Sequence, residues 1–277
     1  MVQTWKIGIK SVEEIHFEDE TSLDAVSRHL PDGYYSTFRT YNSCTRVIGL
    51  SAHLKRLPGL NGSSLREPLI RLLAPFHATE ARARITQTYE GQIYISIEPL
   101  QRLPAWVYEK GVRVVTTSVC RDDPRIKSTA FISQSERERK HIAKEGVFEA
   151  LLVKNGRIFE GMTSNFFYII RPEWCEARPQ GAQKGILYTA QRDILLGVTR
   201  RAVIRAAQGS GVQVRYKGCK LNQLPALSEA FITSSSRGIV PVVQIDDVRV
   251  GQGKVGAVTR QLIRAYEAYV TQKAETI

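Results

Sequence analysis

Residues 149–170 contain the strongest local structural signal in the chain, a predicted β-hairpin. Two apolar runs, 150–153 and 166–170, lie on either side of a polar insert that begins with Asn155-Gly156. Asn-Gly between apolar runs predicts a tight turn, because both residues accept a positive φ. The hairpin therefore restricts this part of the chain to a β-sheet.

Glu160 lies at the predicted end of the first hairpin strand, between Phe159 and Gly161. A carboxylate that points inward from a strand end costs free energy unless a cation or a hydrogen-bond donor pairs with it. The local sequence alone favours a surface carboxylate beside a glycine turn. Only the rest of the chain can give Glu160 a function.

The length and composition are those of a soluble globular protein with one large or two medium domains: 277 residues, 43% apolar and 24% charged. No apolar run approaches the roughly 18–20 residues that cross a bilayer, and the charged segment 1–20 is no signal peptide. We expect no membrane association and a cytoplasmic protein with reduced thiols, because the cysteines are scattered and form no C-x-x-C pair. The same spacing predicts no metal site. The four cysteines are Cys44, Cys120, Cys175 and Cys219.

The formal net charge of +12 suggests nucleic acid as one possible partner. However, the basic residues are spread along the chain and often lie next to acids, as in the segment 136–140. We expect a solvated basic surface and no nucleic-acid binding. An anionic substrate or cofactor would also suit this charge.

Periodicity predicts two α/β units. The proline- and charge-rich segment 121–125 is typical of a linker, so the predicted division is an N-terminal domain over 1–119, a linker over 120–126 and a C-terminal domain over 127–277. Ser51 is the predicted N-cap of a short helix. The other main elements expected are strands over 34–41, 45–50, 111–119, 186–188, 230–233 and 239–245, a hairpin over 83–98, and helices over 64–75, 133–146, 197–208 and 257–272.

The run Glu160-Gly-x-x-Ser164-Asn165-x-Phe167, after a strand that contains Ala-Leu-Leu, resembles the signature of class IV pyridoxal-phosphate aminotransferases. This group includes branched-chain and D-amino-acid aminotransferases and aminodeoxychorismate lyase. The resemblance implies the two-domain α/β (α+β) architecture of fold type IV, with pyridoxal 5'-phosphate between a smaller N-terminal and a larger C-terminal domain. It also implies that Glu160 accepts a hydrogen bond from the protonated pyridine nitrogen, which keeps the ring an electron sink.

Such an enzyme needs a lysine whose amine bonds to the cofactor aldehyde and is partly desolvated, so that it is neutral near pH 7. The resemblance places this lysine at Lys127, which lies 33 residues before Glu160. Taken alone, Lys127 would be an ordinary linker lysine. Lys140 and Lys144 lie among charged neighbours on a predicted helix and are expected to be solvated.

The cofactor phosphate needs N–H donors, hydroxyls and a cation, and a helix N-terminus supplies several donors together. The turn 195–199 resembles the family's Leu-Pro-Gly-Ile-Thr-Arg turn, with Leu196 in place of proline. Ser234-Ser235 match its second phosphate turn, and the segment 53–57 resembles its His-x-x-Arg-Leu motif. Each match also has an ordinary interpretation, such as a threonine N-cap or a surface arginine. The cofactor-binding residues that the resemblance implies are Arg56, Lys127, Glu160, Ser164, Leu195, Val198, Thr199, Ser234 and Ser235.

Tyr35, Arg39 and Arg237 are the predicted substrate-binding residues. Tyr35 matches an aromatic residue that borders the substrate in the family, and Arg39 shares its strand face. The Arg-Gly pair of the D-amino-acid enzymes is replaced by Glu98-Pro99, so Arg39 and Arg237 are the candidates for a bidentate contact with the substrate carboxylate. Either arginine could instead be a structural ion-pair partner.

These observations predict a homodimeric pyridoxal-phosphate-dependent aminotransferase that moves an amino group between an amino acid and a 2-oxo acid. The resemblance favours a D-amino acid or a branched-chain amino acid as donor. Ile132 stands where the branched-chain enzymes usually have tyrosine, which is closer to the D-amino-acid and lyase subtypes. The alternative is 4-amino-4-deoxychorismate lyase, which eliminates pyruvate and whose acidic substrate would suit a basic surface. A non-catalytic nucleic-acid-binding protein on the same fold is suggested only by the net charge.

Overall fold

A computed structural model describes residues 1–18, 21–60, 62–171 and 185–277, and the chain forms two compact units. Unit 1 comprises residues 1–102, 126–134 and 272–277, and unit 2 comprises residues 103–125 and 135–271. The predicted linker 120–126 therefore divides between the two units, and Lys127 falls in unit 1 rather than with residues 135–271. The physical reason is strand pairing, which joins segments that are distant in sequence.

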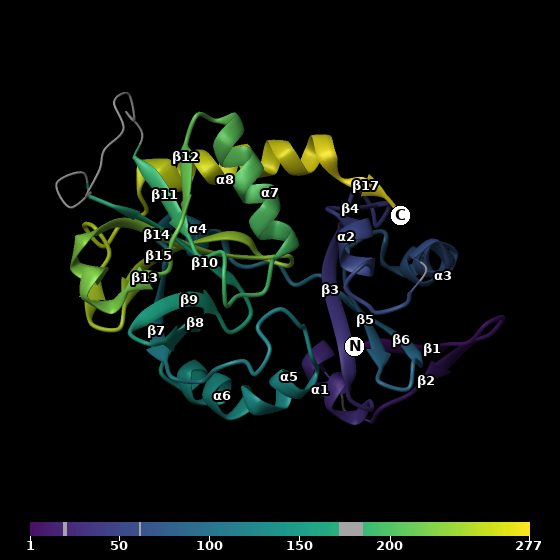
Figure 1. Ribbon diagram of the computed structural model, residues 1–277. Coiled ribbons are helices and arrows are strands. Elements are labelled where there is room, and N and C mark those ends of the chain that lie inside the picture. The colour runs from purple at the N-terminus through teal and green to yellow at the C-terminus, as the bar shows by residue number, and fades with distance from the viewer. Residues whose placement is uncertain (19–20, 61, 172–184) are drawn as a thin grey trace. The chain divides into compact units, whose positions relative to one another are not determined.

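Unit 1 is built on a seven-stranded sheet in the order β17-β4-β3-β5-β6-β1-β2 (Figure 1). The central pairs β3–β5 and β5–β6 are antiparallel, and the latter is the hairpin predicted over 83–98. The elements of unit 1 are β1 Gln3–Ile7, β2 Val12–Ile15, α1 Leu23–His29, β3 Gly33–Tyr41, β4 Arg46–Val47, α2 Leu50–Leu54, α3 Arg66–Leu73, β5 Ala81–Thr88, β6 Ile93–Pro99, α5 Ala130–Gln134 and β17 Glu275–Thr276.

The two faces of this sheet differ in polarity. On one face, apolar side chains such as Phe38, Ile85 and Ile95 form a core with the leucines of α2 and α3. On the other face, alternation places Thr37 opposite Arg84, and α1 is hydrogen-bonded to this polar surface through its Leu23 carbonyl. The polar face of unit 1 is therefore where charged groups gather.

Unit 2 contains a ten-stranded sheet in the order β12-β11-β10-β14-β15-β7-β8-β9-β13, with β16 paired to β15. A further pairing between β10 and β9 closes the circuit, so six strands form a ring around an apolar core. The elements of unit 2 are α4 Ala105–Lys110, β7 Val112–Thr117, α6 Glu136–Lys144, β8 Glu149–Lys154, β9 Arg157–Gly161, β10 Asn165–Ile170, β11 Ile186–Thr189, α7 Val198–Gly209, β12 Gln213–Tyr216, β13 Cys219–Lys220, β14 Leu227–Ser234, β15 Gly238–Ile245, β16 Val248–Arg249 and α8 Ala257–Lys273, which ends in unit 1.

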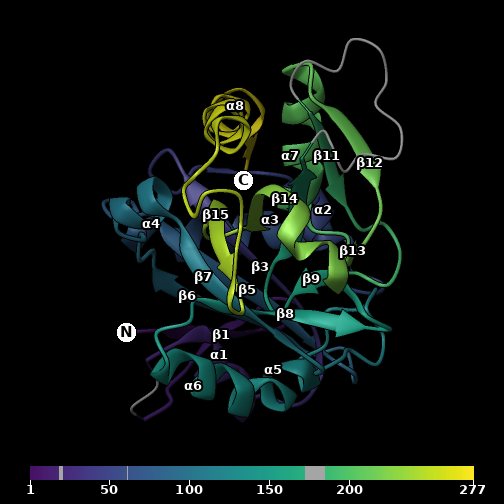
Figure 2. The ribbon, with the colours of Figure 1, turned by 90° about the vertical axis from the view of Figure 1, so that its left-hand side faces the viewer.

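The predicted hairpin over 149–170 is confirmed. Strands β8 and β9 pair antiparallel around Asn155 and Gly156, whose φ values are 51° and 68°. Strand β7 pairs in parallel with β8, which explains why the segment before residue 120 belongs to unit 2. Helix α7 packs beside β12 and β14, and Figure 2 shows it next to β11 and β12.

A β-bulge in β9 decides which face of the sheet carries Glu160. Leu152 is opposite Glu160, whereas Val153 is opposite Ile158, so Phe159 is an extra residue without a partner. Consecutive residues point to opposite faces, and residues directly opposite share a face. Glu160 therefore lies on the other face from Ile158, which is part of the apolar core. Bulges redirect side chains in this way next to functional sites.

Three local predictions need correction. The N-cap of α2 is Gly49 in the left-handed region, with φ 63°, because the Ser51 hydroxyl instead donates to Glu275 at 2.9 Å. The helix predicted over 133–146 consists of α5 and α6, and the strand predicted over 45–50 shortens to β4. Residues 172–184, which include Cys175, lie outside the described residues. In the part of the chain that the structure describes, no helix has both the length and the apolar character needed to cross a membrane.

Candidate active site

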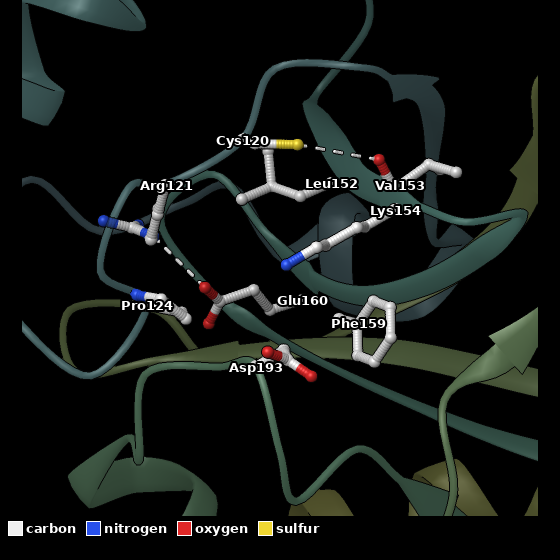
Figure 3. Close-up of a pocket in the computed structure, with 9 residues that line it drawn as sticks. All are labelled: Cys120, Arg121, Pro124, Leu152, Val153, Lys154, Phe159, Glu160 and Asp193. Atoms are coloured by element: carbon white, nitrogen blue, oxygen red, sulfur yellow. Dashed lines mark hydrogen bonds and ion pairs between the residues drawn. The ribbon is translucent and has the colours of Figure 1, made fainter.

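Glu160 is a buried carboxylate, 2% exposed, with three donors around it. Arg121 Nε lies 3.1 Å from Oε1, while the Leu195 N–H lies 3.0 Å and Asn165 Nδ2 lies 3.3 Å from Oε2. Figure 3 shows Arg121 reaching Glu160 across a pocket that Lys154 also lines. Charge-assisted hydrogen bonds of this kind offset the cost of burying a carboxylate.

Glu160 begins a row of polar side chains across three neighbouring strands. Asn165 on β10 is opposite both Glu160 on β9 and Thr233 on β14, so the three side chains share one face of the sheet. Thr233 is 2% exposed, and its hydroxyl makes no hydrogen bond to any described residue. A buried hydroxyl without a partner costs free energy. This face of the sheet therefore fits a polar ligand.

The N-terminus of α7 lies at the same face. Its N-cap, Gly197, makes no side-chain capping bond, and the first turn holds no acidic residue. A Cβ on Gly197 would lie 2.1 Å from Asn165 Oδ1, so the helix start and the polar row are in contact. The buried Thr199 hydroxyl lies 3.4 Å from the Ser235 hydroxyl in the turn after β14. Free N–H groups, the positive end of the helix dipole and two hydroxyls together suit a phosphate.

Gly197→Ala tests whether this close approach is needed. The added methyl group would lie 2.1 Å from Asn165 Oδ1, and rotating the Asn165 amide to relieve this contact would break the hydrogen bond from its Nδ2 to the Leu195 carbonyl. We therefore expect α7 to move away from Asn165. The affinity for pyridoxal phosphate, measured by titration of the apoprotein, should fall about tenfold or more. Gly209→Ala at the other end of α7 is the matched control, because open space surrounds that position. Equal affinities in the two variants would contradict the assignment.

Arg200, which the sequence analysis did not single out, holds the segment before α7. It is 2% exposed, and its Nη2 donates to the Ala190 carbonyl at 2.6 Å and to Gln191 Oε1 at 2.8 Å. Burial lowers the pKa of Arg200 to about 10, while the nearby Tyr216 raises it and Arg125 lowers it further. Arg125 also donates to the Gln191 carbonyl. Two arginines thus fix the segment that supplies the Leu195 N–H to Glu160.

Ser164 and Arg237 meet at a second buried carboxylate, Glu149. The Ser164 hydroxyl donates to Glu149 Oε1 at 2.8 Å, and Arg237 Nη2 lies 2.8 Å from Oε2. Arg237 Nε also donates to the Ser234 hydroxyl at 2.9 Å. The contact of Arg237 with a substrate carboxylate stays a prediction, and these bonds show that its guanidinium already has partners.

In unit 1, Lys127 is fixed to the start of β3. The Tyr35 N–H donates to the Lys127 carbonyl at 2.9 Å, and the Thr129 N–H donates to the Gly33 carbonyl at the same distance. The Lys127 side chain is half-buried, with Nζ 4.7 Å from the centre of the Tyr35 ring. The guanidinium carbon of Arg84 lies 4.6 Å from the centre of the same ring. The Lys127 amine is therefore partly desolvated, and the guanidinium of Arg84 contacts the same Tyr35 ring.

Arg39 and Arg56 also lie in unit 1. Arg39 shares the face of Tyr35 as predicted, and its guanidinium stacks on Tyr41 with 4.6 Å between Cζ and the ring centre. Arg39 Nε is buried without a hydrogen bond to a described residue. Arg56 is half-buried and follows the end of α2, rather than lying inside the predicted helix.

The structure thus brings the predicted residues together in two groups. Unit 1 holds Lys127, Tyr35, Arg39 and Arg56, and unit 2 holds Glu160, Ser164, Leu195, Val198, Thr199, Ser234, Ser235 and Arg237. Sequence reasoning missed Arg121, Asn165 and Arg200. Of these, only Asn165 was signalled, by its place in the Ser-Asn motif. The residues of unit 2 fit both the ring nitrogen and the phosphate of pyridoxal phosphate, since Glu160 and the orphaned Thr233 hydroxyl share a face with the uncapped helix start.

Comparison with known proteins agrees with this geometry. The model of the family described as Amino-transferase class IV matches residues 33–245. D-alanine aminotransferase of Bacillus licheniformis is 25% identical to this chain, and the match covers 89% of this chain and 90% of that protein. Branched-chain-amino-acid aminotransferase of Escherichia coli strain K12 is 28% identical over 184 residues, which cover 62% of this chain but only 54% of that protein.

The fold has close counterparts among solved structures. A putative branched-chain amino acid aminotransferase from Thermotoga maritima superimposes with a TM-score of 0.77 and 25% sequence identity. The match covers 98% of this chain and 96% of that one. Both units therefore have counterparts in this relative.

Proposed function

The chain belongs to the class IV aminotransferase family, and on that premise we propose that Lys127, Glu160 and the N-terminus of α7 form its cofactor site. Its reaction is the transfer of an amino group between an amino acid and a 2-oxo acid, with pyridoxal phosphate as cofactor. The observation that carries the proposal is the polar face of unit 2, where Glu160, Asn165 and Thr233 lie in one row beside Gly197.

Glu160 would hold the ring nitrogen. The Glu160 carboxylate, which pairs with Arg121, would accept a hydrogen bond from a protonated pyridine nitrogen, because a buried cation gains most from an opposite charge at hydrogen-bond distance. When bound, the cofactor supplies an electron sink for the Cα–H bond of the amino acid. The Leu195 N–H and Asn165 then keep the second carboxylate oxygen in place.

The phosphate would lie at the start of α7. The N–H groups of Val198 and Thr199 and the hydroxyls of Thr199, Ser234 and Ser235 are the proposed donors, and Arg56 of unit 1 is the proposed cation. Ser164 would act on the cofactor indirectly, because its hydroxyl donates to Glu149.

Lys127 would bind the cofactor aldehyde through its amine. The Lys127 amine would also be the base that takes the Cα proton of the amino acid and the acid that returns it. The contact with the Tyr35 ring supports this role, because it holds the Lys127 amine at a half-buried position. Tyr35 and Arg39 are the proposed contacts of the substrate itself. The guanidinium of Arg237 already pairs with Glu149 and Ser234.

We also propose a homodimer in the cytoplasm. The dimer follows from the family resemblance. The cytoplasmic site is supported by Cys44 and Cys219, which form no disulfide within the described part of the chain. Burial raises the pKa of Cys219 to about 12, so that this thiol is unreactive at neutral pH.

A visible absorption spectrum tests the proposed function. Purified protein loaded with pyridoxal phosphate should be yellow and should lose that colour when an amino acid is added without a 2-oxo acid. Separate additions of D-alanine, L-leucine and L-alanine distinguish the two donor classes suggested by the resemblance, since the true donor bleaches the band fastest.

Each other result of this experiment has a definite meaning. A yellow band that no amino acid bleaches, together with release of pyruvate from 4-amino-4-deoxychorismate without an added 2-oxo acid, would favour the lyase alternative. A protein that gains no band after cofactor is added would contradict the proposed site. Salt-sensitive binding of nucleic acid by such a colourless protein would support the non-catalytic alternative.

A further inference from the structure

An ion pair in unit 2 joins the turn that follows Glu160, between β9 and β10, to the turn between β14 and β15, which presents Ser235. Glu149, the first residue of β8, is 4% exposed, and its Oε2 lies 2.8 Å from Arg237 Nη2. Arg237 lies in the turn between β14 and β15 and is 22% exposed. A buried carboxylate is costly unless its oxygens are fully hydrogen-bonded. The hydrogen bonds that Glu149 and Arg237 make to their neighbours therefore identify the segments that the pair holds in place.

The carboxylate of Glu149 sits inside the turn between β9 and β10. It accepts hydrogen bonds from the Thr163 N–H at 2.8 Å, the Thr163 hydroxyl at 3.1 Å and the Ser164 hydroxyl at 2.8 Å. A Cβ on Gly161 would lie 2.6 Å from Glu149 Oε1, so this position has no room for a side chain. The turn that Glu149 fills connects Glu160 directly to Asn165, both of which are proposed to serve the ring end.

The guanidinium of Arg237 reaches both turns. Its Nη2 donates to the Thr163 hydroxyl at 2.6 Å as well as to Glu149, while its Nε donates to the Ser234 hydroxyl at 2.9 Å. Its planar face lies over Phe148, with 5.2 Å between Cζ and the ring centre. Its carbonyl accepts a hydrogen bond from Tyr108. This one side chain thus connects the 161–164 turn to the turn that presents Ser234 and Ser235.

We propose that Glu149 and Arg237 are a positioning pair that fixes the separation between the ring end and the phosphate end of the cofactor site, and that Arg237 does not bind the substrate carboxylate. The proposal rests on the proposed function, which places the ring at Glu160 and the phosphate at Ser234, Ser235 and Thr199. The pair touches neither the cofactor nor the substrate. It acts through Ser234 on one side and through the 161–164 turn on the other.

Arginine is suited to this task because its fork can donate to three acceptors in fixed directions, whereas a lysine ammonium is a point charge on a flexible stem. Loss of the fork frees the 234–237 turn while the ring end stays anchored by Arg121 and Leu195. The binding of the phosphate should therefore suffer more than the binding of the ring. A carboxylate clamp predicts the opposite pattern, a defect toward the substrate alone.

The experiment compares four variants: Arg237→Met, Arg237→Lys, Glu149→Gln and the double variant Glu149→Gln/Arg237→Met. The dissociation constants of pyridoxal phosphate and of pyridoxal, which lacks the phosphate, are measured by titration of each apoprotein. The KM of the amino donor is then measured at saturating cofactor. Arg264→Met is the matched control, because Arg264 is exposed on α8 in the same unit.

We expect Arg237→Met to weaken pyridoxal phosphate binding roughly 10- to 100-fold. This is the range found when the hydrogen-bond partners of metal-binding residues are removed. Pyridoxal binding and the KM of the donor should change less than about threefold, and Arg237→Lys should lie between wild type and methionine. Because the two residues act as a unit, the double variant should be no weaker than the worse single variant. It also leaves no unpaired buried charge, so it keeps the test valid if a single variant misfolds.

Two results would overturn the proposal while leaving the proposed function intact. One is a KM for the donor that rises tenfold or more in Arg237→Met with unchanged cofactor affinity, which is the behaviour of a substrate clamp. The other is wild-type cofactor affinity in the folded double variant. Wild-type protein that binds no pyridoxal phosphate would instead overturn the proposed function.

Discussion

Lys127→Ala should abolish transamination while leaving a folded protein that still binds pyridoxal phosphate. We expect kcat to fall by roughly 10⁴-fold, the upper part of the range that a positioned acid–base group contributes. The cofactor should be held only through its ring and phosphate, so the yellow band of the lysine-bound form should be absent. The measurement is the visible spectrum together with turnover of whichever amino donor the spectral test identifies.

The fold should survive this substitution, because the loss of one half-buried contact with Tyr35 costs only about 1 kcal/mol. Lys140→Ala is the matched control, since Lys140 is 72% exposed and pairs with Glu136 on the surface of α6. It should keep the wild-type spectrum and rate. Near-normal turnover in folded Lys127→Ala would overturn the assignment of Lys127, and methylamine added to that variant should restore part of the rate by replacing the missing amine.

Glu160→Gln should lower kcat by about 10³-fold, the effect of removing one electrostatic group at a site where charge develops. Glutamine can still accept the hydrogen bond of the Leu195 N–H, but its neutral amide does not stabilise a protonated ring nitrogen. The spectrum should show retained cofactor with a slowed loss of colour on addition of the donor. Glu160→Ala should lose activity and, in addition, stability.

The stability effect arises from Arg121, whose side chain is 7% exposed and would lose its buried ion pair with Glu160. Breaking a buried pair in this way costs about 3–5 kcal/mol, which thermal unfolding would detect. The double variant Glu160→Gln/Arg121→Met separates the two roles of Glu160. It should regain stability but not activity if Glu160 serves the ring nitrogen, whereas recovery of both would show that Glu160 is only a structural partner of Arg121.

The contrast between Glu160 and Arg237 shows how two carboxylate–arginine pairs can serve one site differently. The Glu160–Arg121 pair leaves the carboxylate in the polar row that faces Thr233, where a ligand can reach it. The Glu149–Arg237 pair fills the interior of two turns and is shielded by Gly161 and Phe148. The first pair is proposed to act on the cofactor, and the second to act on the loops that hold it.

Local sequence was sufficient wherever one residue type alone satisfies the backbone. Asn155 and Gly156 predicted their turn because a positive φ is a property of those two residues and not of the fold around them. The start of α7 near Gly197 was also predicted, from a glycine followed by a helical pattern. The run around Glu160 and the position of Lys127 carried the family resemblance, and the match of the family model over residues 33–245 supports it.

Tertiary structure alone decided the direction and the partners of these residues. Strand alternation by itself would have placed Glu160 with Ile158 in the apolar core, and only the pairing register with β8 shows the bulge at Phe159 that turns it to the other face. Arg121 and Glu160 are 39 residues apart, and Glu149 and Arg237 are 88 apart, so no local pattern connects them. A backbone turn is set by the residues that form it, whereas a buried ion pair depends on which distant strands come together and on how much water they exclude. The sequence alone therefore determined the turns and pointed to the catalytic residue types, while the fold determined which charges those residues face.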